Sequence, residues 1–207
     1  MFTCYICSMS IGKFPVFPLK TICFPGHRIP IKIFEDRYIQ MLKDIEEAPY
    51  FVIALISSGE EVGCDATPYR VGCLVEVDTI QKQGDFTLIK PTGIHRVYLE
   101  SFDREGKPYL TAECSDYLDE MVSAESRDRV PDFEAQILQM VKVFGQEDSR
   151  GIREVLEALR DELDRENYSL FLCGCLQVPP IYLQRLLESR SLSYRIENAL
   201  NLLSQRE

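Results

Sequence analysis

Proline interrupts one apolar stretch of the chain too often for a continuous helix to form there. From Phe14 to Tyr38 the sequence reads FPVFPLKTICFPGHRIPIKIFEDRY and holds four of the eleven prolines. Because proline fixes φ and removes a backbone donor, it confines such a run to short strands, edges and turns. We predict two short strands, at 15–19 and 29–34. A tight turn at Phe24-Pro25-Gly26 should separate them, since proline presets φ and glycine permits a positive φ.

The residues that follow predict one helix and then a sheet. Apolar residues recur at helical spacing after Glu35, and Pro49 ends that helix. The uninterrupted apolar run at 50–57 is typical of a strand that is buried on both faces. Short turns between the later strands favour a largely antiparallel, barrel-like sheet. The later strands are expected at 70–79, at 86–99 with a break at 91–93, and at 107–117.

After residue 118 the hydrophobic period changes to that of helices. We therefore predict an α+β fold, with a β-rich, barrel-like part followed by a C-terminal helical bundle. The expected divisions are an N-terminal arm at 1–12, the β-rich part at 13–118, a charged linker at 119–131 and the bundle at 132–207.

Composition limits the classes of partner. The chain of 207 residues carries a formal charge of −10, without a basic cluster. This balance argues against binding a nucleic-acid backbone, where cationic side chains supply most of the affinity. No apolar run approaches the roughly 20 residues that span a bilayer, and we recognise no signal peptide. We expect a cytoplasmic monomer or weak homodimer with no membrane partner.

Cysteines offer a weak metal hypothesis. Cys4 and Cys7 form one close pair, and Cys173 and Cys175 form the other; together they could supply four thiolates to zinc. However, the second pair lies in an apolar helical segment, where residues two apart point in different directions. We favour cysteines that pack as small hydrophobic residues, and we expect no metal and no cofactor.

Several motifs of nucleotide and hydrolase chemistry are missing from the sequence. It has no G-x-x-x-x-G-K-[ST] loop for phosphates and no G-x-S-x-G nucleophile turn. We therefore expect no enzymatic activity. Glu35 is interpreted as a helix cap, Arg37 as pairing with a nearby carboxylate to brace the fold, and Arg96 as fixing a neighbouring loop. The alternative for both arginines is that they contact a bound peptide.

Spaced motifs in a fixed order resemble the N-terminal substrate-binding domain of the ATP-dependent Lon (La) proteases. This domain also occurs alone in small bacterial proteins and as the Lon-like part of cereblon. The resemblance covers about 14–117 clearly and the helical remainder more loosely, and it implies a PUA-like β-rich fold. Its residues are Phe14, Pro15, Pro18, Leu19, Pro30, Phe34, Glu35, Arg37, Tyr38, Gly72, Gly93 and Arg96, together with the Phe24-Pro25-Gly26 turn.

The resemblance implies a non-catalytic module that binds unfolded or exposed polypeptide segments of other proteins, without the ATPase and peptidase parts of Lon. The expected contacts are Phe24, Pro25, Gly26 and His27, as an exposed and partly apolar turn; the alternative is that this turn only closes the barrel. Two other functions stay open. One is an RNA-binding PUA-like module, and the other is a cysteine-based zinc or redox protein.

Overall fold

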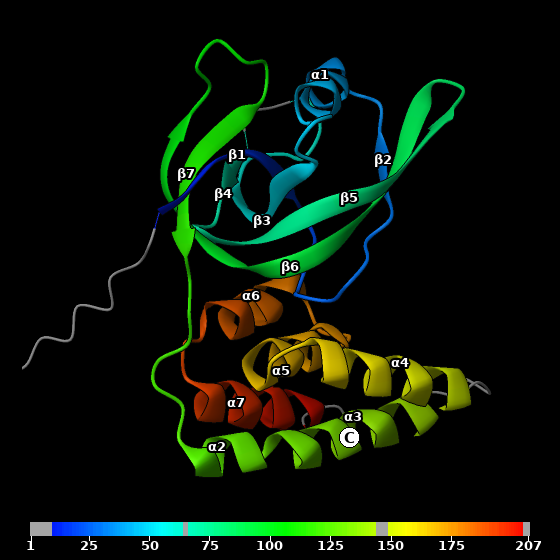
Figure 1. Cartoon of the computed structure of the whole chain (residues 1–207), viewed down its shortest axis with the longest axis vertical. Helices are drawn as coiled ribbons and strands as arrows, with labels where there is room; N and C mark the ends of the chain where they lie inside the picture. Colours follow the sequence, from blue (N-terminus) through cyan, green and yellow to red (C-terminus); the bar gives the residue numbers. More distant parts are fainter. Residues whose placement is uncertain (1–9, 64–65, 144–148, 205–207) are drawn as a thin grey trace, which may run out of the picture.

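A barrel of β-strands and a bundle of helices make up the molecule, with the bundle packed below the barrel in the view of Figure 1. The computed structural model describes residues 10–63, 66–143 and 149–204. The strands are β1 Ser10–Leu19, β2 Ile31–Ile33, β3 Tyr50–Ser58, β4 Thr67–Pro68, β5 Val71–Gln83, β6 Phe86–Asp103 and β7 Leu110–Asp116.

The barrel closes because β1 pairs along two stretches with two different strands. Residues 10–16 of β1 run antiparallel to β7, and residues 16–19 run parallel to β3. From β7 the order continues through β6 and β5 to β3, with each neighbour antiparallel. The short strands β2 and β4 lie outside this ring, paired with β6 and β3 respectively. The predicted α+β fold with a barrel-like sheet is confirmed.

Both faces of the barrel wall are buried, which explains the uninterrupted apolar run of β3. Successive side chains of a strand point to opposite faces. Thus Val52 packs in the interior, while its neighbour Ile53 packs under the helix α1 (Asp36–Asp44) and β2. Five strands supply the interior cluster, which consists of Val16, Val52, Ala54, Leu74, Val97, Leu99, Ala112 and Cys114.

One predicted break is wrong, because β6 continues through 91–93. The opposing strand β5 shifts its register on both sides of this segment, between Leu74 and Val75 and between Val77 and Ile80. These irregularities accommodate Pro91, which has no N–H to give to the ladder. The carbonyl of Pro91 still accepts a hydrogen bond, from Ile29 N at 3.1 Å.

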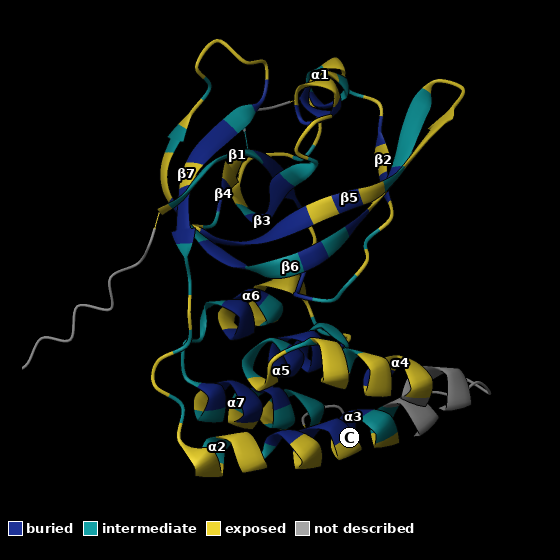
Figure 2. Ribbon diagram, viewed as in Figure 1, coloured by how far each residue is buried: buried dark blue, intermediate teal, exposed yellow. Residues whose placement is uncertain are grey.

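All but the shortest of the described bundle helices bury side chains in a shared core (Figure 2). This core cluster also takes in Ile22, Phe24, Leu55 and Val71 from the barrel, so the two halves share one apolar contact. The bundle helices are α2 Ala124–Asp128, α3 Val130–Val143, α4 Ser149–Glu162, α5 Arg165–Gly174, α6 Pro180–Glu188 and α7 Leu192–Ser204. No helix in the described ranges is both long and apolar enough to span a membrane.

The division into a barrel part and a bundle part remains our interpretation, and β1 and α3 cross its expected boundaries at 12/13 and 131/132. Residues 10–12 of the expected arm already belong to β1, while residues 1–9 lie outside the described part of the chain. The expected linker at 119–131 contains α2, which Ser123 caps by accepting from Ser126 N. A hydroxyl N-cap of this kind stabilises even a short charged helix.

Candidate functional site

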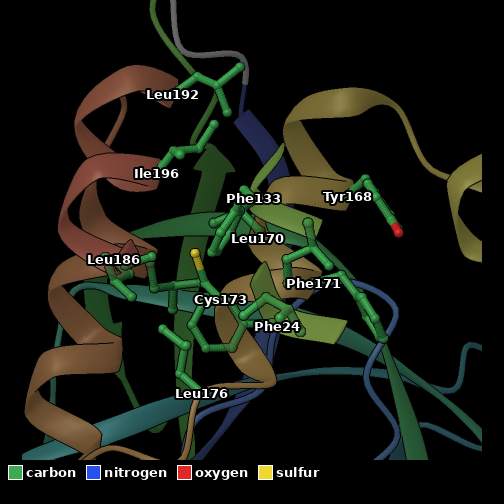
Figure 3. Close-up of a cluster of buried hydrophobic side chains, with 14 of the residues drawn as sticks. Phe24, Phe133, Tyr168, Leu170, Phe171, Cys173, Leu176, Leu186, Leu192 and Ile196 are labelled. Carbon is green, nitrogen blue, oxygen red and sulfur yellow. The ribbon is translucent and has the colours of Figure 1, made fainter. Parts of the chain in front are cut away.

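The Phe24–His27 segment forms the expected tight turn, but the expectation that it is exposed is wrong. His27 N donates to the carbonyl of Phe24 at 3.1 Å, and Gly26 has a φ of 78°. The ring of Phe24 is 1% exposed and points into the helical cluster (Figure 3). Pro25 is also buried, and Gly26 and His27 are partly so. Burial of the large Phe24 ring against the bundle is the reason, since an exposed ring would leave that apolar area in water.

Hydrogen bonds hold the same turn between β6 and α5. Gly26 N donates to the carbonyl of Gly93 at 2.8 Å, and His27 Nε2 lies 2.8 Å from the carbonyl of Phe171. A carbonyl only accepts, so Nε2 carries the proton in this contact. Burial lowers the pKa of His27, although the Phe171 hydrogen bond opposes that shift. The turn therefore joins the two halves of the molecule.

Glycine is required where the backbone approaches this turn. A Cβ added to Gly93 would lie 2.2 Å from the carbonyl oxygen of Phe24, and one added to Gly174 would lie 2.5 Å from His27 Nε2. Gly72 has the same role inside the barrel, since its Cβ would lie 2.7 Å from the carbonyl oxygen of Ile53. The family motif glycines thus permit close packing.

Arg96 fixes a loop, as the sequence predicts. It is 4% exposed, and its Nη1 donates to the carbonyls of Leu187 and Ser189 at 2.7 Å each. Its Nη2 pairs with Asp119, which also accepts from Arg195 at 2.5 and 3.0 Å. One buried carboxylate therefore ties β6, the segment after β7 and α7 together.

The thiols in the described residues do not favour metal binding. Burial raises the pKa of Cys173 and of Cys175 to about 12, which disfavours the thiolate form that zinc requires. Cys4 and Cys7 lie outside the described residues. Within the ranges that the structure describes, no cluster of three or more His, Cys, Asp or Glu side chains is arranged for a metal ion.

An apolar cleft of about 320 Å³ lies between β1 and β2, and we refer to it as the β1–β2 cleft. One wall comes from Phe17 and Leu19 of β1, and the other from the continuous stretch 29–35, which contains β2. Five family motif residues, all from the stretch 19–38, meet here. They are Leu19, Pro30, Phe34, Glu35 and Tyr38.

Two large apolar side chains at this cleft remain exposed. Phe34 and Val62 are each 54% exposed, whereas the neighbouring Ile31 and Ile33 are buried. Phe17 and Tyr38, which also line the cleft, stack with their ring centroids 4.0 Å apart. Exposed apolar side chains beside a cleft with an aromatic lining are typical of a surface that takes an apolar partner.

An ion pair holds the loop that carries Val62 over the cleft. Arg37 pairs with Glu35 at 3.0 Å and donates to the carbonyl of Glu61 at 3.4 Å, and Glu35 accepts from Gly63 N at 3.1 Å. The expected ion-pair role of Arg37 is confirmed. Glu35 does occupy the N-cap position of α1, but its side chain makes no capping hydrogen bond; it binds the Gly63 loop instead.

The sequence motifs thus divide into residues that build the fold and residues that line the cleft. The cleft residues outside the motif set are Thr21, Glu61 and Val62, which lie in loops without a periodic signal, and Phe17, Ile29, Ile31, Lys32 and Ile33. The residues that build the fold are Phe14, Pro15 and Pro18 in β1, Gly72 in β5, and Gly93 and Arg96 in β6.

Two solved structures of Lon N-terminal domains share this fold. The N-terminal domain of the Mycobacterium avium complex Lon protease superposes with a TM-score of 0.72 at 16% identity, covering 94% of this chain and 100% of that one. A Lon N-terminal domain protein from Xanthomonas campestris gives a TM-score of 0.62 at 17% identity, covering 92% and 98%. A search among curated proteins gave no match.

The family model described as the ATP-dependent protease La (LON) substrate-binding domain matches residues 13–205. This range includes the barrel, the bundle and the segment between them. The chain belongs to the Lon substrate-binding domain family.

Proposed function

We propose that the chain is a non-catalytic module that binds exposed apolar segments of other polypeptides in the β1–β2 cleft. The observation that carries this proposal is the meeting of the family motif residues at an apolar cleft beside the exposed Phe34 and Val62. Binding there would bury these two side chains and supply the hydrophobic contribution to affinity.

Support for a non-catalytic role comes from the groups around the cleft. Its two acidic side chains, Glu35 and Glu61, are held in structural contacts: Glu35 pairs with Arg37, and Glu61 accepts from Lys20 N at 2.7 Å. Such fixed groups are suited to shaping a surface, and the residues that line the cleft include no serine, cysteine or histidine.

Polypeptide is a better proposed partner than RNA. The chain has a net charge of −10, and an RNA backbone would be repelled unless a local basic patch offset that charge. We propose the cytoplasm as the location, because the five cysteines among the described residues are free thiols, as in reducing compartments. A monomer or weak homodimer remains the proposed state.

The proposed function can be tested with a permanently unfolded probe, such as reduced and carboxymethylated lactalbumin with a fluorescent label. Fluorescence anisotropy would measure its affinity for the wild type, for Phe34→Asp and for Val62→Asp. We expect each variant to weaken binding by about tenfold or more, because a carboxylate replaces a buried apolar contact.

Ile80→Asp is the matched control, since Ile80 is 56% exposed on β5 and does not line the cleft. It should bind the probe like the wild type, and circular dichroism should show that all three variants fold. Equal binding by Phe34→Asp and wild type, or no binding by wild type, would refute the proposed function.

A further inference from the structure

The β1–β2 cleft follows the edge of a strand. On a strand, alternate residues face the same side, so a groove across one face is lined by every second residue. β1 lines the cleft in this way, through Phe17 and Leu19. On the opposite wall, each residue from 29 to 35 lines it without a gap. Such continuous lining indicates that the cleft runs along the edge of β2.

This edge of β2 carries backbone groups without a partner strand. Among the described residues β2 pairs only with β6, in the antiparallel register Ile31 to Ile89 and Ile33 to Thr87. In an antiparallel pair, every second residue directs its N–H and C=O away from the partner strand. The outer edge of β2 therefore offers main-chain donors and acceptors to the cleft. Open edges of this kind accept an added strand.

We propose, building on the proposed function, that the bound segment is extended and adds to the outer edge of β2 as a further strand. Its backbone hydrogen-bonds to β2, and every second side chain enters the cleft toward Phe17, Leu19 and Phe34. Residues 29–35 would match a segment of about seven residues, or about 23 Å at 3.3 Å per residue. Pockets for alternate side chains then give the selectivity.

Charge narrows the class of segment further. The lining side chains include two acidic groups, Glu35 and Glu61, against the basic Lys32, and the whole chain carries −10. Arg37 neutralises Glu35 through its ion pair, and Glu61 accepts from Lys20 N, so the charge of the whole chain, rather than a local pair of carboxylates, favours basic ends on the bound segment. Segments of β-branched and aromatic residues with lysine or arginine at their ends fit this site. Acidic or proline-interrupted segments do not.

The test uses a labelled synthetic peptide of alternating valine and threonine with a lysine at each end. A matched peptide replaces its central amide bonds with esters, which removes backbone donors but keeps the side chains. We expect the amide peptide to bind by anisotropy and the ester peptide to bind at least about tenfold more weakly, because the added strand loses its hydrogen bonds. A version with glutamate at each end should also bind more weakly.

Amide hydrogen exchange locates the binding. With the amide peptide bound, exchange should slow within Ile31–Ile33, while the one backbone amide of the other short edge strand, that of Thr67 in β4, keeps its free rate. Phe34→Asp should abolish the slowing and Ile80→Asp should preserve it.

Four results would overturn strand addition. The first is equal binding of the ester and amide peptides. The second is slowed exchange at β4 alone. The third is failure of both peptides when unfolded lactalbumin binds. The fourth is slow amide exchange in β2 of the free protein, together with a dimer that forms as the protein concentration rises. In that case a second copy of the chain would occupy the edge of β2. The proposed function survives the first three, and it fails separately if unfolded lactalbumin itself does not bind.

Discussion

At the scale of single residues, close backbone approaches decide which positions tolerate change. Gly93 lets β6 touch the Phe24 carbonyl, and this contact is set by glycine alone, because a Cβ there would overlap main-chain atoms that cannot rotate away. The same turn carries His27, whose ring hydrogen-bonds to the carbonyl of Phe171 in α5. Stability and pH response should both depend on this small region.

Replacing Gly93 with alanine should destabilise the fold. The added Cβ would lie 2.2 Å from the Phe24 oxygen, so β6 or the turn must shift. We expect the free energy of unfolding to fall by about 3 kcal/mol, as for overpacking at rigid sites. Urea denaturation would measure it.

Gly84→Ala is the control for this variant, since Gly84 has a φ of 58° and open space around its Cβ position. This substitution should lower the free energy of unfolding by about 1 kcal/mol, because of backbone strain alone. If both variants lost the same stability, steric contact at Gly93 would not be the cause.

His27 should make the fold less stable in mild acid. Its pKa in the folded chain is lowered by burial from the ordinary value of 6.5, so the unfolded chain takes up the proton first. The penalty is absent well above that value, grows as the pH falls through it, and levels off below the folded pKa. His27→Gln retains a donor for Phe171 without titrating.

The measurement is urea denaturation of wild type and His27→Gln from about pH 7.5 to about pH 5. We expect the stability difference between the two proteins to move in favour of the variant as the pH falls. Burial also lowers the pKa of His95, but that contribution is common to both proteins. A difference that stayed constant with pH would contradict the neutral, buried state of His27.

Sequence reasoning identified the tight turn at Phe24–His27 but not its burial. The turn follows from local φ preferences of proline and glycine, which are visible in the sequence. Burial of Phe24 depends on α5, which is about 150 residues away in the chain, and no local pattern encodes that contact. Arg96 was interpreted correctly because an arginine among apolar strand residues needs a polar partner.

At the scale of elements, the segment after β7 both connects the barrel to the bundle and supplies a buried contact between them. Asp119 has a side chain only 4% exposed and accepts from both Arg96 of β6 and Arg195 of α7. Two guanidinium groups thus share one buried carboxylate between the barrel and the bundle. Removing that carboxylate leaves both cations buried without their counter-ion.

We therefore expect Asp119→Ala to lower the free energy of unfolding by about 3–5 kcal/mol. Asp128→Ala is the matched control, because the Asp128 side chain is 78% exposed and lies 3.6 Å from Arg165. Its effect should stay within about 0.5 kcal/mol. Similar losses in the two variants, measured by urea denaturation, would contradict the role assigned to Asp119.

The positions of helices and strands could be predicted from the sequence better than the pairing of the strands. β3 is marked by a continuous apolar run and the larger bundle helices by a helical period, and their approximate positions follow from these patterns. The continuity of β6 through Pro91 depends on register shifts in β5, which the sequence of β6 does not contain. The open edge of β2 follows from the strand order of the whole barrel, so the candidate cleft could not be assembled from motifs alone.

At the scale of the whole molecule, charge should separate polypeptide from nucleic-acid partners. The net charge of −10 gives a repulsive field for phosphates. A single-stranded RNA of about 30 nucleotides should show no retention in a filter-binding assay near physiological salt. Salt-sensitive retention would instead favour an RNA-binding role for the PUA-like barrel.

The most direct test of the central claim is chemical-shift mapping of the isotope-labelled protein with unfolded lactalbumin. We expect the shifted amides to be those of Ile29, of residues 31–35 and of Val62, which border the β1–β2 cleft. The groove between α6 and α7, which Tyr182 and Tyr194 line, should stay unchanged. Shifts confined to that groove, or to the buried turn at Phe24–His27, would contradict recognition of polypeptide at the β1–β2 cleft.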